Sequence, residues 1–307
     1  MNITFRQIRY FIAVADAGKI SSAATNLNIS QSAVSAAIMS LEEEVGAPLF
    51  QRQFGGVQLT YEGYQFLSHA QNILAAVSEA TRGLRLSGRT VQGRVRVGLT
   101  YTVAGYFIPQ ILTRFTRSFP DVQVQMHEWH RDDIELKIVN GQIDIAVILV
   151  SNLRNTDQID SKILLKSRRR LWLCADHPLM NVDPVGFSEI SQQPYIMLTV
   201  DEAESSALRY WSTTGFKPNI AFKTSSVEAV RSMVATGMGV TILSDMVYRP
   251  WSLEGQHVEV KDVNGPVQSM DVGLIWRKNL KMDAPTKVFF DYLCLTFADA
   301  ESGYQQR

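Results

Sequence analysis

Residues 21–41 read SSAATNLNISQSAVSAAIMSL and contain two helical patterns separated by a short break at residues 28–30. Apolar side chains recur at helical spacing on both sides of the break: Ala23, Ala24 and Leu27 before it, and Val34, Ile38 and Leu41 after it. Small alanines let two helices cross closely, which is what a helix-turn-helix requires. The stretch therefore predicts a helix-turn-helix, whose second helix presents its first turns to the major groove of DNA.

Capping residues set the expected helix boundaries in this region. Thr4 and Gln7 have the spacing of a capping box, in which each side chain satisfies a free backbone N–H of the first turn. The helix that begins there is expected to end at Gly18. One of the serines at 21–22 is expected to cap the second helix, and Ser30 the third.

The outward face of the third helix follows from its buried apolar stripe. With that stripe turned inward, the side chains that face outward near the start of the helix are Gln31, Ser32, Ser35 and Ala36. Gln31 is the expected base reader, because its amide can bond to both N6 and N7 of adenine. Ser32 and Ser35 are expected to contact phosphates or single base edges.

Two short runs at residues 49–52 and 57–60 flank Gly55-Gly56 and indicate a β-hairpin, which would form a wing. Arg52 is the only cation of this hairpin and is expected beside the DNA backbone or the minor groove. The same three helices also fit a packing module with no role in DNA binding.

The pattern of residues 21–63 resembles the winged helix of the LysR family of bacterial transcription regulators. The residues that carry the resemblance are Ser21-Ser22-Ala23-Ala24, Leu27, Ser30-Gln31, Ala33-Val34-Ser35, Ile38, Leu41-Glu42, Gly46, Leu49-Phe50, Arg52, Leu59-Thr60 and Gly63. The resemblance implies an activator or repressor that binds double-stranded DNA and senses a small organic molecule, often a carboxylate. RNA polymerase is then a further expected partner.

Two features reduce the expected affinity for DNA. The outer face of the third helix carries Ala36, Ala37, Met39 and Ser40, where the family usually carries Arg, Gln or Lys, and the wing has Gly55 and Gln58 where arginines are common. The 30 basic and 30 acidic side chains cancel, so no positive field favours nucleic acid. Fewer phosphate contacts predict weaker non-specific binding with a shallower salt dependence.

The length of 307 residues suffices for two or three domains, and the composition is that of an ordinary globular protein. No run approaches the ~18 consecutive apolar residues of a membrane span. The N-terminus lacks the features of a secretion signal, so we expect a cytoplasmic protein with no membrane partner. Two cysteines, Cys174 and Cys294, give no disulfide framework and no reason to expect a redox-sensing pair.

Residues 61–88 contain no proline and predict a long helix that follows a DNA-binding domain at residues 1–60. Apolar side chains form a narrow heptad seam along it, and the expected dimer contacts are Leu67, Leu74, Val77 and Leu84. The resemblance implies pairing with the same helix of a second copy, in a homodimer or a dimer of dimers. The alternative is that the seam packs on its own domain. Ser87-Gly88-Arg89-Thr90 is the expected hinge.

From residue 91 onward strands and helices alternate, which predicts parallel α/β sheets with helices on their faces; one helix is expected over 104–119. The order of elements resembles the two-lobed effector domain of the family, which is similar to type II periplasmic solute-binding proteins. We expect this domain over residues 91–300, with lobe I at about 91–162 and 267–300 and lobe II at about 163–266. The expected fold class is thus an α+β winged helix-turn-helix, a linker helix and a two-lobed α/β domain.

Ligands of parallel α/β sheets bind beyond the carboxyl ends of the strands. The segments that follow predicted strands supply the candidate effector contacts: Thr100, Tyr101 and Thr102; Trp129, His130 and Arg131; and Thr199 and Val200. Arg131 and the hydroxyls suit a carboxylate, and the aromatic rings suggest a bulky group. Each threonine could instead simply cap a helix.

Other chemistries find little support in the sequence. His127 and His130 lie three apart but have no partners at metal-ligand spacing, so no metal site is expected. The Gly237-Met238-Gly239 turn lacks the third glycine and the following helix of a dinucleotide fingerprint, and no cofactor is expected. No convergent set of catalytic groups indicates an enzyme. An enzyme that uses the interlobe cleft, or a solute-binding protein whose N-terminal module only oligomerises, remain the alternatives.

Overall fold

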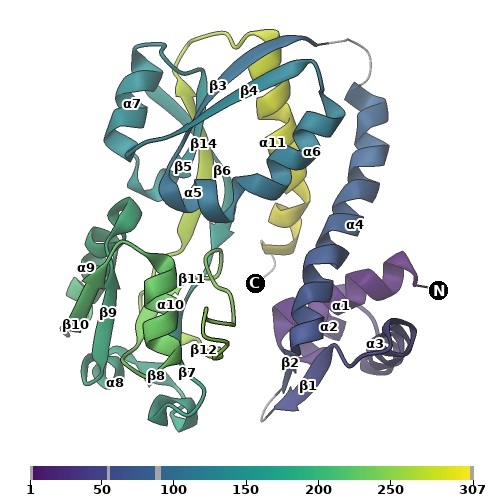
Figure 1. Cartoon of the computed structure of the whole chain (residues 1–307), viewed down its shortest axis with the longest axis vertical. Helices are drawn as coiled ribbons and strands as arrows, with labels where there is room; N and C mark the ends of the chain where they lie inside the picture. Colours follow the sequence, from purple (N-terminus) through teal and green to yellow (C-terminus); the bar gives the residue numbers. More distant parts are fainter. Residues whose placement is uncertain (1–2, 54–55, 87–90, 305–307) are drawn as a thin grey trace. The chain divides into compact units, whose positions relative to one another are not determined.

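The computed structural model describes residues 3–53, 56–86 and 91–304 of the chain (Figure 1). Contacts between residues divide the chain into two units, Met1–Arg89 and Thr90–Arg307. The predicted hinge at Ser87–Thr90 and the wing residue Gly55 lie outside the described residues. None of the helices in the described ranges combines the length and the hydrophobicity that crossing a membrane would take.

The first unit is a helix-turn-helix followed by a hairpin and a long helix (Figure 1). Its elements are α1 (Phe5–Ala17), α2 (Ile20–Leu27), α3 (Gln31–Val45), β1 (Phe50–Gln53), β2 (Gly56–Leu59) and α4 (Tyr61–Leu86). The two strands pair antiparallel, with Phe50 opposite Leu59. The predicted helix-turn-helix and its hairpin are thereby confirmed.

Three of the predicted helix boundaries are confirmed by their caps. Thr4 and Gln7 form the capping box of α1, and Gly18 ends that helix with a φ of 64°. Ser30 caps α3, because its Oγ accepts a hydrogen bond from the backbone N–H of Ala33. These contacts span only three or four residues, so the local sequence is enough to specify them.

The predicted start of α2 is wrong. The helix begins at Ile20 with Lys19 as its N-cap, so the serines at 21–22 lie within its first turn. The backbone N–H of Ala23 donates to the carbonyl of Lys19 at 3.0 Å, which starts the helix. Lys19 makes no side-chain cap bond, so backbone bonding alone sets this helix start.

Aromatic rings from three elements form the centre of the first unit's core. Phe11 of α1 is fully buried, and its ring centroid lies 5.1 Å from that of Phe50 in the hairpin. Phe66 of α4 approaches the same ring edge-on, at 5.0 Å. The predicted apolar stripe of α3, Val34, Ile38 and Leu41, is buried beside them. Hairpin and long helix therefore share one core with the three short helices.

The start of α4 lies directly against the hairpin. A Cβ on Gly63 would lie 2.0 Å from the carbonyl oxygen of Leu49, so only glycine fits there. Glu42 of α3 fixes the start of the hairpin from the other side. Its Oε1 accepts hydrogen bonds from the N–H groups of Leu49 at 2.7 Å and Phe50 at 3.0 Å. The third helix, the hairpin and α4 are thus held in one fixed arrangement.

Lobe I of the second unit is a five-stranded sheet with helices packed against it (Figure 1). In the order β4-β3-β5-β14-β6, the strands are Val122–Glu128, Gly93–Leu99, Ile145–Leu149, Met270–Arg277 and Ile159–Ser167. The helices are α5 (Tyr101–Tyr106), α6 (Ile108–Ser118), α7 (Arg131–Val139) and α11 (Ala284–Tyr304), with a 3₁₀ turn η1 (Val150–Asn152) after β5. A fully buried apolar layer, centred on Val95, Val97 and Val147, joins sheet and helices.

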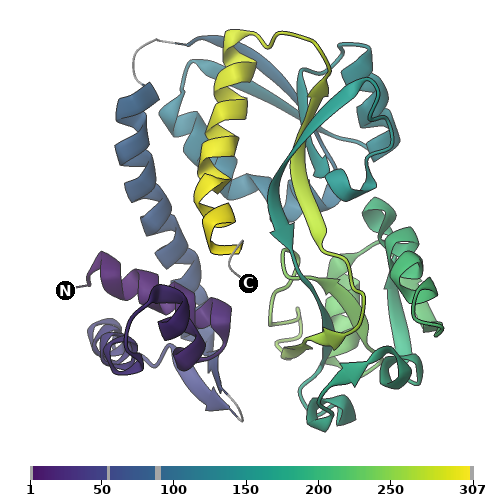
Figure 2. The same ribbon diagram turned by 180° about the vertical axis from the view of Figure 1, so that it is seen from behind.

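The sheet of lobe I is mixed, whereas the sequence predicted a parallel one. β3 is parallel to both β4 and β5, but β14 runs antiparallel to β5 and β6. The reason is topological: β14 brings the chain back from lobe II, so no crossover helix turns it around. The sequence pattern did not reveal the edge strand β6, which pairs with β14. Earlier in the chain, β6 leads from lobe I into lobe II (Figure 2).

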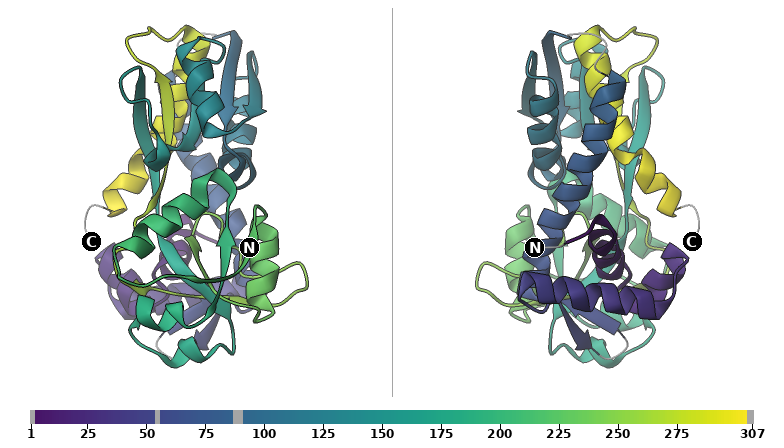
Figure 3. Two further views of the ribbon diagram at one scale, coloured as in Figure 1. Left: turned by 90° about the vertical axis from the view of Figure 1, so that its left-hand side faces the viewer. Right: turned by 90° about the vertical axis from the view of Figure 1, so that its right-hand side faces the viewer.

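Lobe II is made of short sheets and helices, and the chain passes between the lobes twice, after β6 and before β14 (Figures 2 and 3). Its strands are β7 (Arg169–Cys174), β8 (Val185–Gly186), β9 (Pro194–Leu198), β10 (Asn219–Thr224), β11 (Thr241–Ser244), β12 (Val258–Lys261) and β13 (Val263–Asn264). Its helices are α8 (Phe187–Ser191), α9 (Ala203–Ser212) and α10 (Val227–Ala235), with 3₁₀ turns η2 (Pro178–Asn181) and η3 (Val200–Glu202). The predicted two-lobed α/β architecture is confirmed.

The single helix predicted over residues 104–119 is in fact two helices. Pro109 stands in the first turn of α6. Because proline has no N–H, it cannot bond to the carbonyl of Gly105, and α5 ends at Tyr106. The short helix α5 then packs Tyr101 and Tyr106 against the core of lobe II.

We predict that Gly63→Ala selectively destabilises the first unit, by about 1–3 kcal/mol, because the new Cβ would press on the Leu49 carbonyl. All five tryptophans lie in the second unit. Thermal unfolding followed by circular dichroism should therefore shift to lower temperature while the tryptophan fluorescence transition stays in place. Gly105→Ala is the control, since nothing lies within 4 Å of its Cβ position. Equal behaviour of the two variants would contradict this packing.

Candidate functional site

The start of α3 presents a small and mostly uncharged surface. Gln31, Ser32 and Ala36 are exposed, as the sequence predicts for them, and Ser35 is half-buried. The hydroxyl of Ser32 lies 3.1 Å from that of Ser30, the residue that caps the helix. Met39, one turn further along the outer face, is 62% exposed. Gln31, Ser32 and Ser35 are thus the main side chains on this face that could form hydrogen bonds with DNA.

Positive charge in the first unit comes from elements other than α3. Arg6 and Arg9 are exposed on α1, Lys19 is exposed between α1 and α2, and Arg52 is exposed on β1. The sequence pattern singled out only Arg52. The two arginines of α1 are three residues apart and share a helix face, a spacing that could have identified them.

The predicted dimer seam of α4 is partly used within its own unit. Ala70 is fully buried, and Leu67 and Leu74 pack against the core that surrounds Phe11. Further along the helix Val77 is 38% exposed. The side chain of Leu84 lies outside the described residues.

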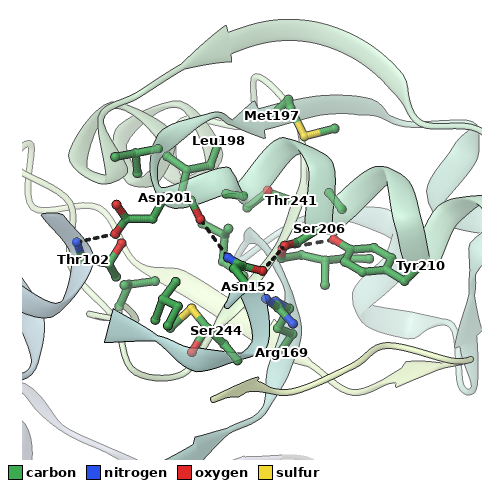
Figure 4. Close-up of a pocket in the computed structure, with 18 of the residues that line it drawn as sticks. Thr102, Asn152, Arg169, Met197, Leu198, Asp201, Ser206, Tyr210, Thr241 and Ser244 are labelled. Atoms are coloured by element: carbon green, nitrogen blue, oxygen red, sulfur yellow. Dashed lines mark hydrogen bonds between the residues drawn. The ribbon is translucent and has the colours of Figure 1, made fainter. Parts of the chain in front are cut away.

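A narrow pocket lies between the two lobes of the second unit (Figure 4). Lobe I contributes Thr102, Leu149, Asn152 and Met270. Lobe II contributes the polar side chains of Arg169, Asp201, Ser206, Tyr210, Thr241 and Ser244, and apolar side chains that include Met197, Leu198, Ile242 and Leu243. A mostly apolar cavity with a few convergent polar groups is the usual form of a small-molecule site.

Arg169 is the cation of this pocket. Its Nη1 donates to the backbone carbonyls of Gln268 and Ser269, at 2.5 and 2.7 Å. Burial lowers the pKa of the Arg169 guanidinium, although its high intrinsic basicity keeps it charged. Within the described ranges no acidic side chain forms an ion pair with it, which leaves the charge available to an anion in the pocket.

Hydroxyl groups surround the same cavity. Thr241 is 1% exposed, and its Oγ1 has no hydrogen-bond partner among the described residues. The hydroxyl of Tyr210 lies 3.3 Å from that of Tyr195, and burial raises the pKa of Tyr210 well above its usual value. The phenol is therefore neutral at physiological pH. Ser206 donates to Oδ1 of Asn152 at 3.3 Å across the lobes.

Asp201 and Glu202, here called the acidic turn, reach from lobe II to lobe I. The backbone N–H of Thr102 donates to Oδ2 of Asp201 at 2.6 Å (Figure 4). Nε of Arg131 donates to Oε1 of Glu202 at 3.0 Å. The amide of Asn152 donates to the carbonyl of Asp201 at 3.2 Å and to Oε2 of Glu202 at 3.4 Å.

Only two of the eight predicted effector contacts line the pocket, namely Thr102 and Val200. Thr100 is buried at the N-terminus of α5, and its Oγ1 has no partner in the described structure. Tyr101 packs on lobe II, and the backbone N–H of Thr199 bonds to Thr224. The expectation that ligands bind beyond the carboxyl ends of strands correctly placed α5 and η3 near one another. It did not distinguish the residues that line the pocket from their neighbours in the chain.

The predicted group Trp129, His130 and Arg131 lies away from the pocket lining. Trp129 stacks on His127, with ring centroids 5.0 Å apart, and His130 is the N-cap of α7. Arg131 is 2% exposed, and its guanidinium is surrounded by carboxylates of Asp132, Glu135 and Glu202. Its charge is therefore already matched by the protein itself and is not free for a ligand.

Most of the residues that line the pocket carry no signal in the sequence. Arg169 begins β7, Ser206 and Tyr210 lie on α9, and Thr241 begins β11. No motif marks them, because they meet only after the chain has crossed between the lobes. Asn152, which follows the buried strand β5, is the one that the expectation about strand ends could have found.

We predict that Arg131→Ala lowers the free energy of unfolding of the second unit by about 3–5 kcal/mol, because it leaves Glu135 buried without a counter-charge. Asp132→Ala is the matched control, since its carboxylate pairs with the same guanidinium but is 67% exposed. The control should change stability by less than about 1 kcal/mol. Urea unfolding followed by tryptophan fluorescence measures both. A small effect of Arg131→Ala would show that this charge is not buried in solution.

Two family models match the chain. Residues 5–64 match the bacterial regulatory helix-turn-helix protein, lysR family, and residues 88–295 match the LysR substrate binding domain. The uncharacterized HTH-type transcriptional regulator YwqM of Bacillus subtilis (strain 168) is 30% identical over 95% of this chain and 99% of its own. A hydrogen peroxide-inducible genes activator of Pectobacterium carotovorum subsp. carotovorum is 25% identical over 100% of this chain and 99% of its own.

A solved structure that is similar to this chain is also a LysR family regulator. The crystal structure of HinK, a LysR family transcriptional regulator from Pseudomonas aeruginosa, superposes with a TM-score of 0.62 at 26% identity, over 95% of this chain and 98% of that one. The relatives named above are regulators and not enzymes. Because the substrate-binding model matches more than half of the chain and the helix-turn-helix model matches residues 5–64, the chain belongs to the LysR family of transcriptional regulators.

Proposed function

We propose that this regulator binds a specific DNA sequence and responds to a small organic acid held between the lobes of its second unit. The observation that carries the proposal is Arg169, a charged side chain that faces a largely apolar pocket without an acidic partner in the described structure. A half-buried cation of this kind favours an anionic ligand, because the ligand completes its ion pair.

The lining supports one anionic group on an apolar body. Thr241 offers a hydroxyl that lacks a partner within the described ranges, and Ser206 offers another near Arg169. Met197 and Leu243 line the rest with apolar surface. We infer that the carboxylate of the effector meets Arg169 and that its hydrocarbon part lies against these side chains.

For DNA, we infer that Gln31 reads adenine from the major groove, with Ser32, Ser35 and Ala36 beside it. Among the side chains that the structure describes in this unit, the exposed cations are Arg6, Arg9, Lys19 and Arg52, and these would contact phosphates. With no cation on α3 itself, sequence-specific contacts would contribute a larger share of the affinity than in a strongly basic recognition helix.

Two copies of the chain would place two recognition helices on successive half-sites. We infer that α4 pairs with its counterpart in the second copy. Leu67 and Leu74 pack partly on their own unit, so Val77 and Leu84 would form the main contacts, together with Ile73, which is 40% exposed. A homodimer, or a tetramer built from two dimers, would act in the cytoplasm and contact RNA polymerase at the promoter. The functional boundaries would fall near residues 60, 88 and 91.

Sensing through a thiol is a second candidate function, because some relatives are named as hydrogen peroxide-inducible activators. The two cysteines of this chain do not favour it. Cys174 is buried in β7 of lobe II, and Cys294 lies on α11 of lobe I. Burial raises the pKa of both thiols, and a raised pKa reduces the thiolate that would react with peroxide. Reversible binding of a ligand is the better-supported mechanism.

We predict that Gln31→Ala weakens binding to fragments of the gene's own upstream region by about tenfold, the cost of one bidentate base contact. Gel shifts across a salt series measure this, because loss of a base contact leaves the salt slope unchanged. Gln65→Ala, an exposed glutamine on α4, is the control and should bind like the wild type. Equal binding of every fragment, indifferent to Gln31, would argue against sequence-specific reading.

We predict that small monocarboxylic acids which raise the melting temperature of the full chain depend on Arg169. Arg169→Gln should weaken their binding about tenfold or more, the loss of a charge-assisted hydrogen bond pair. The neighbouring Arg168→Gln is the control, since Arg168 is half exposed and pairs with Asp262. A thermal shift series reads out all three proteins. Acids that stabilise Arg169→Gln as well as the wild type would refute the assigned anchor.

A further inference from the structure

The acidic turn has a backbone conformation that its residue types do not prefer. Asp201 has a φ of 49° and Glu202 a φ of 57°, in the left-handed region that L-residues rarely adopt. Two such residues in succession store strain, which persists only where surrounding contacts outweigh it. Within lobe II the hydroxyl of Ser205 donates to the carbonyl of Glu202 at 3.0 Å. The carboxylates of the turn make their contacts across the lobes, with Thr102, Arg131 and Asn152.

These contacts can open without leaving a buried charge unmatched. Arg131 would keep Glu135, whose Oε1 lies 2.5 Å from Nη1, and Asp132 at 2.7 Å from Nη2. Glu202 is 27% exposed, so water can solvate it once it is released. The turn therefore joins the lobes through bonds of the strong, charge-assisted kind that are nonetheless separable.

The acidic turn also borders the ligand pocket. Asp201 and Val200 line it, and Ser206 links the following helix to Asn152 of lobe I. Thr102 lines the pocket as well, and its N–H is already taken by Asp201. A ligand that fills the space beside Thr102 and Asn152 would displace the carboxylate that holds them.

We propose that the acidic turn is a built-in latch: in the ligand-free chain Asp201 and Glu202 hold lobe II onto lobe I, and an effector enters against these contacts. The proposal rests on the pocket assigned above as the effector site, but the latch itself needs no effector to exist. Release of the turn would relieve its strained backbone while loosening the lobes. The chain would then have two arrangements of its lobes, which a ligand can bias.

The test is amide hydrogen exchange, read by mass spectrometry, on the full chain with neither DNA nor ligand added. The variant carries Asp201→Asn and Glu202→Gln together, which removes both charges and keeps the size of each side chain. Asparagine also tolerates the left-handed conformation. We expect the peptide that contains Thr102 to exchange about tenfold faster or more in the variant, because the bond to a charged acceptor is lost.

Two controls separate the latch from general loosening. Glu204→Gln removes a neighbouring carboxylate that pairs with Lys223 inside lobe II, and it should leave exchange at Thr102 unchanged. The buried strand β5 should stay protected in every protein, which shows that lobe I remains folded. Unchanged exchange at Thr102 in the double variant, or an increase that extends to β5, would overturn the latch. Neither result depends on whether the pocket binds an acid, so failure of the latch and of the effector assignment can be told apart.

Discussion

A guanidinium group that is 2% exposed must have carboxylates around it, and the surroundings of Arg131 are arranged to provide them. Two come from its own helix and the third, Glu202, from the other lobe. Glu135 in turn accepts hydrogen bonds from the N–H groups of Arg154 at 3.2 Å and Asn155 at 3.0 Å. One buried charge thereby fixes the start of α7, the loop after β5 and the turn that borders the pocket.

The sequence specifies the parts of this structure whose contacts are local. The capping box of Thr4 and Gln7 and the cap at Ser30 each act within three residues, and the stripe of α3 repeats every three or four. The pocket is different. Arg131 and Glu202 are 71 positions apart, and Arg169 faces groups from both lobes. The sequence suggested a ligand anchor at Arg131, although Asp132 and Glu135 on the same helix already offered it carboxylates. The third carboxylate, Glu202, comes from the other lobe, and a pattern along the chain cannot reveal that pairing.

The two units place cations in different settings. In the second unit Arg131 is buried and is matched by carboxylates of both lobes. In the first unit cations stand exposed on α1 and β1, while the outer face near the start of α3 carries the small side chains of Ser32 and Ala36. A helix with a small outer face can approach base edges closely, and methyl groups such as that of Ala36 can contact thymine. The contacts of Glu42 and Gly63 with the start of the hairpin fix the position of α3 relative to the hairpin, as such an approach requires.

Arg169 stands where the chain enters lobe II from lobe I, and it contacts the segment that leads back. It begins β7, directly after the first crossing, and its Nη1 holds the carbonyls of Gln268 and Ser269, directly before the second. The same guanidinium that faces the pocket therefore bridges both connecting segments. An anion bound to Arg169, as proposed, would therefore act directly on both segments that connect the lobes.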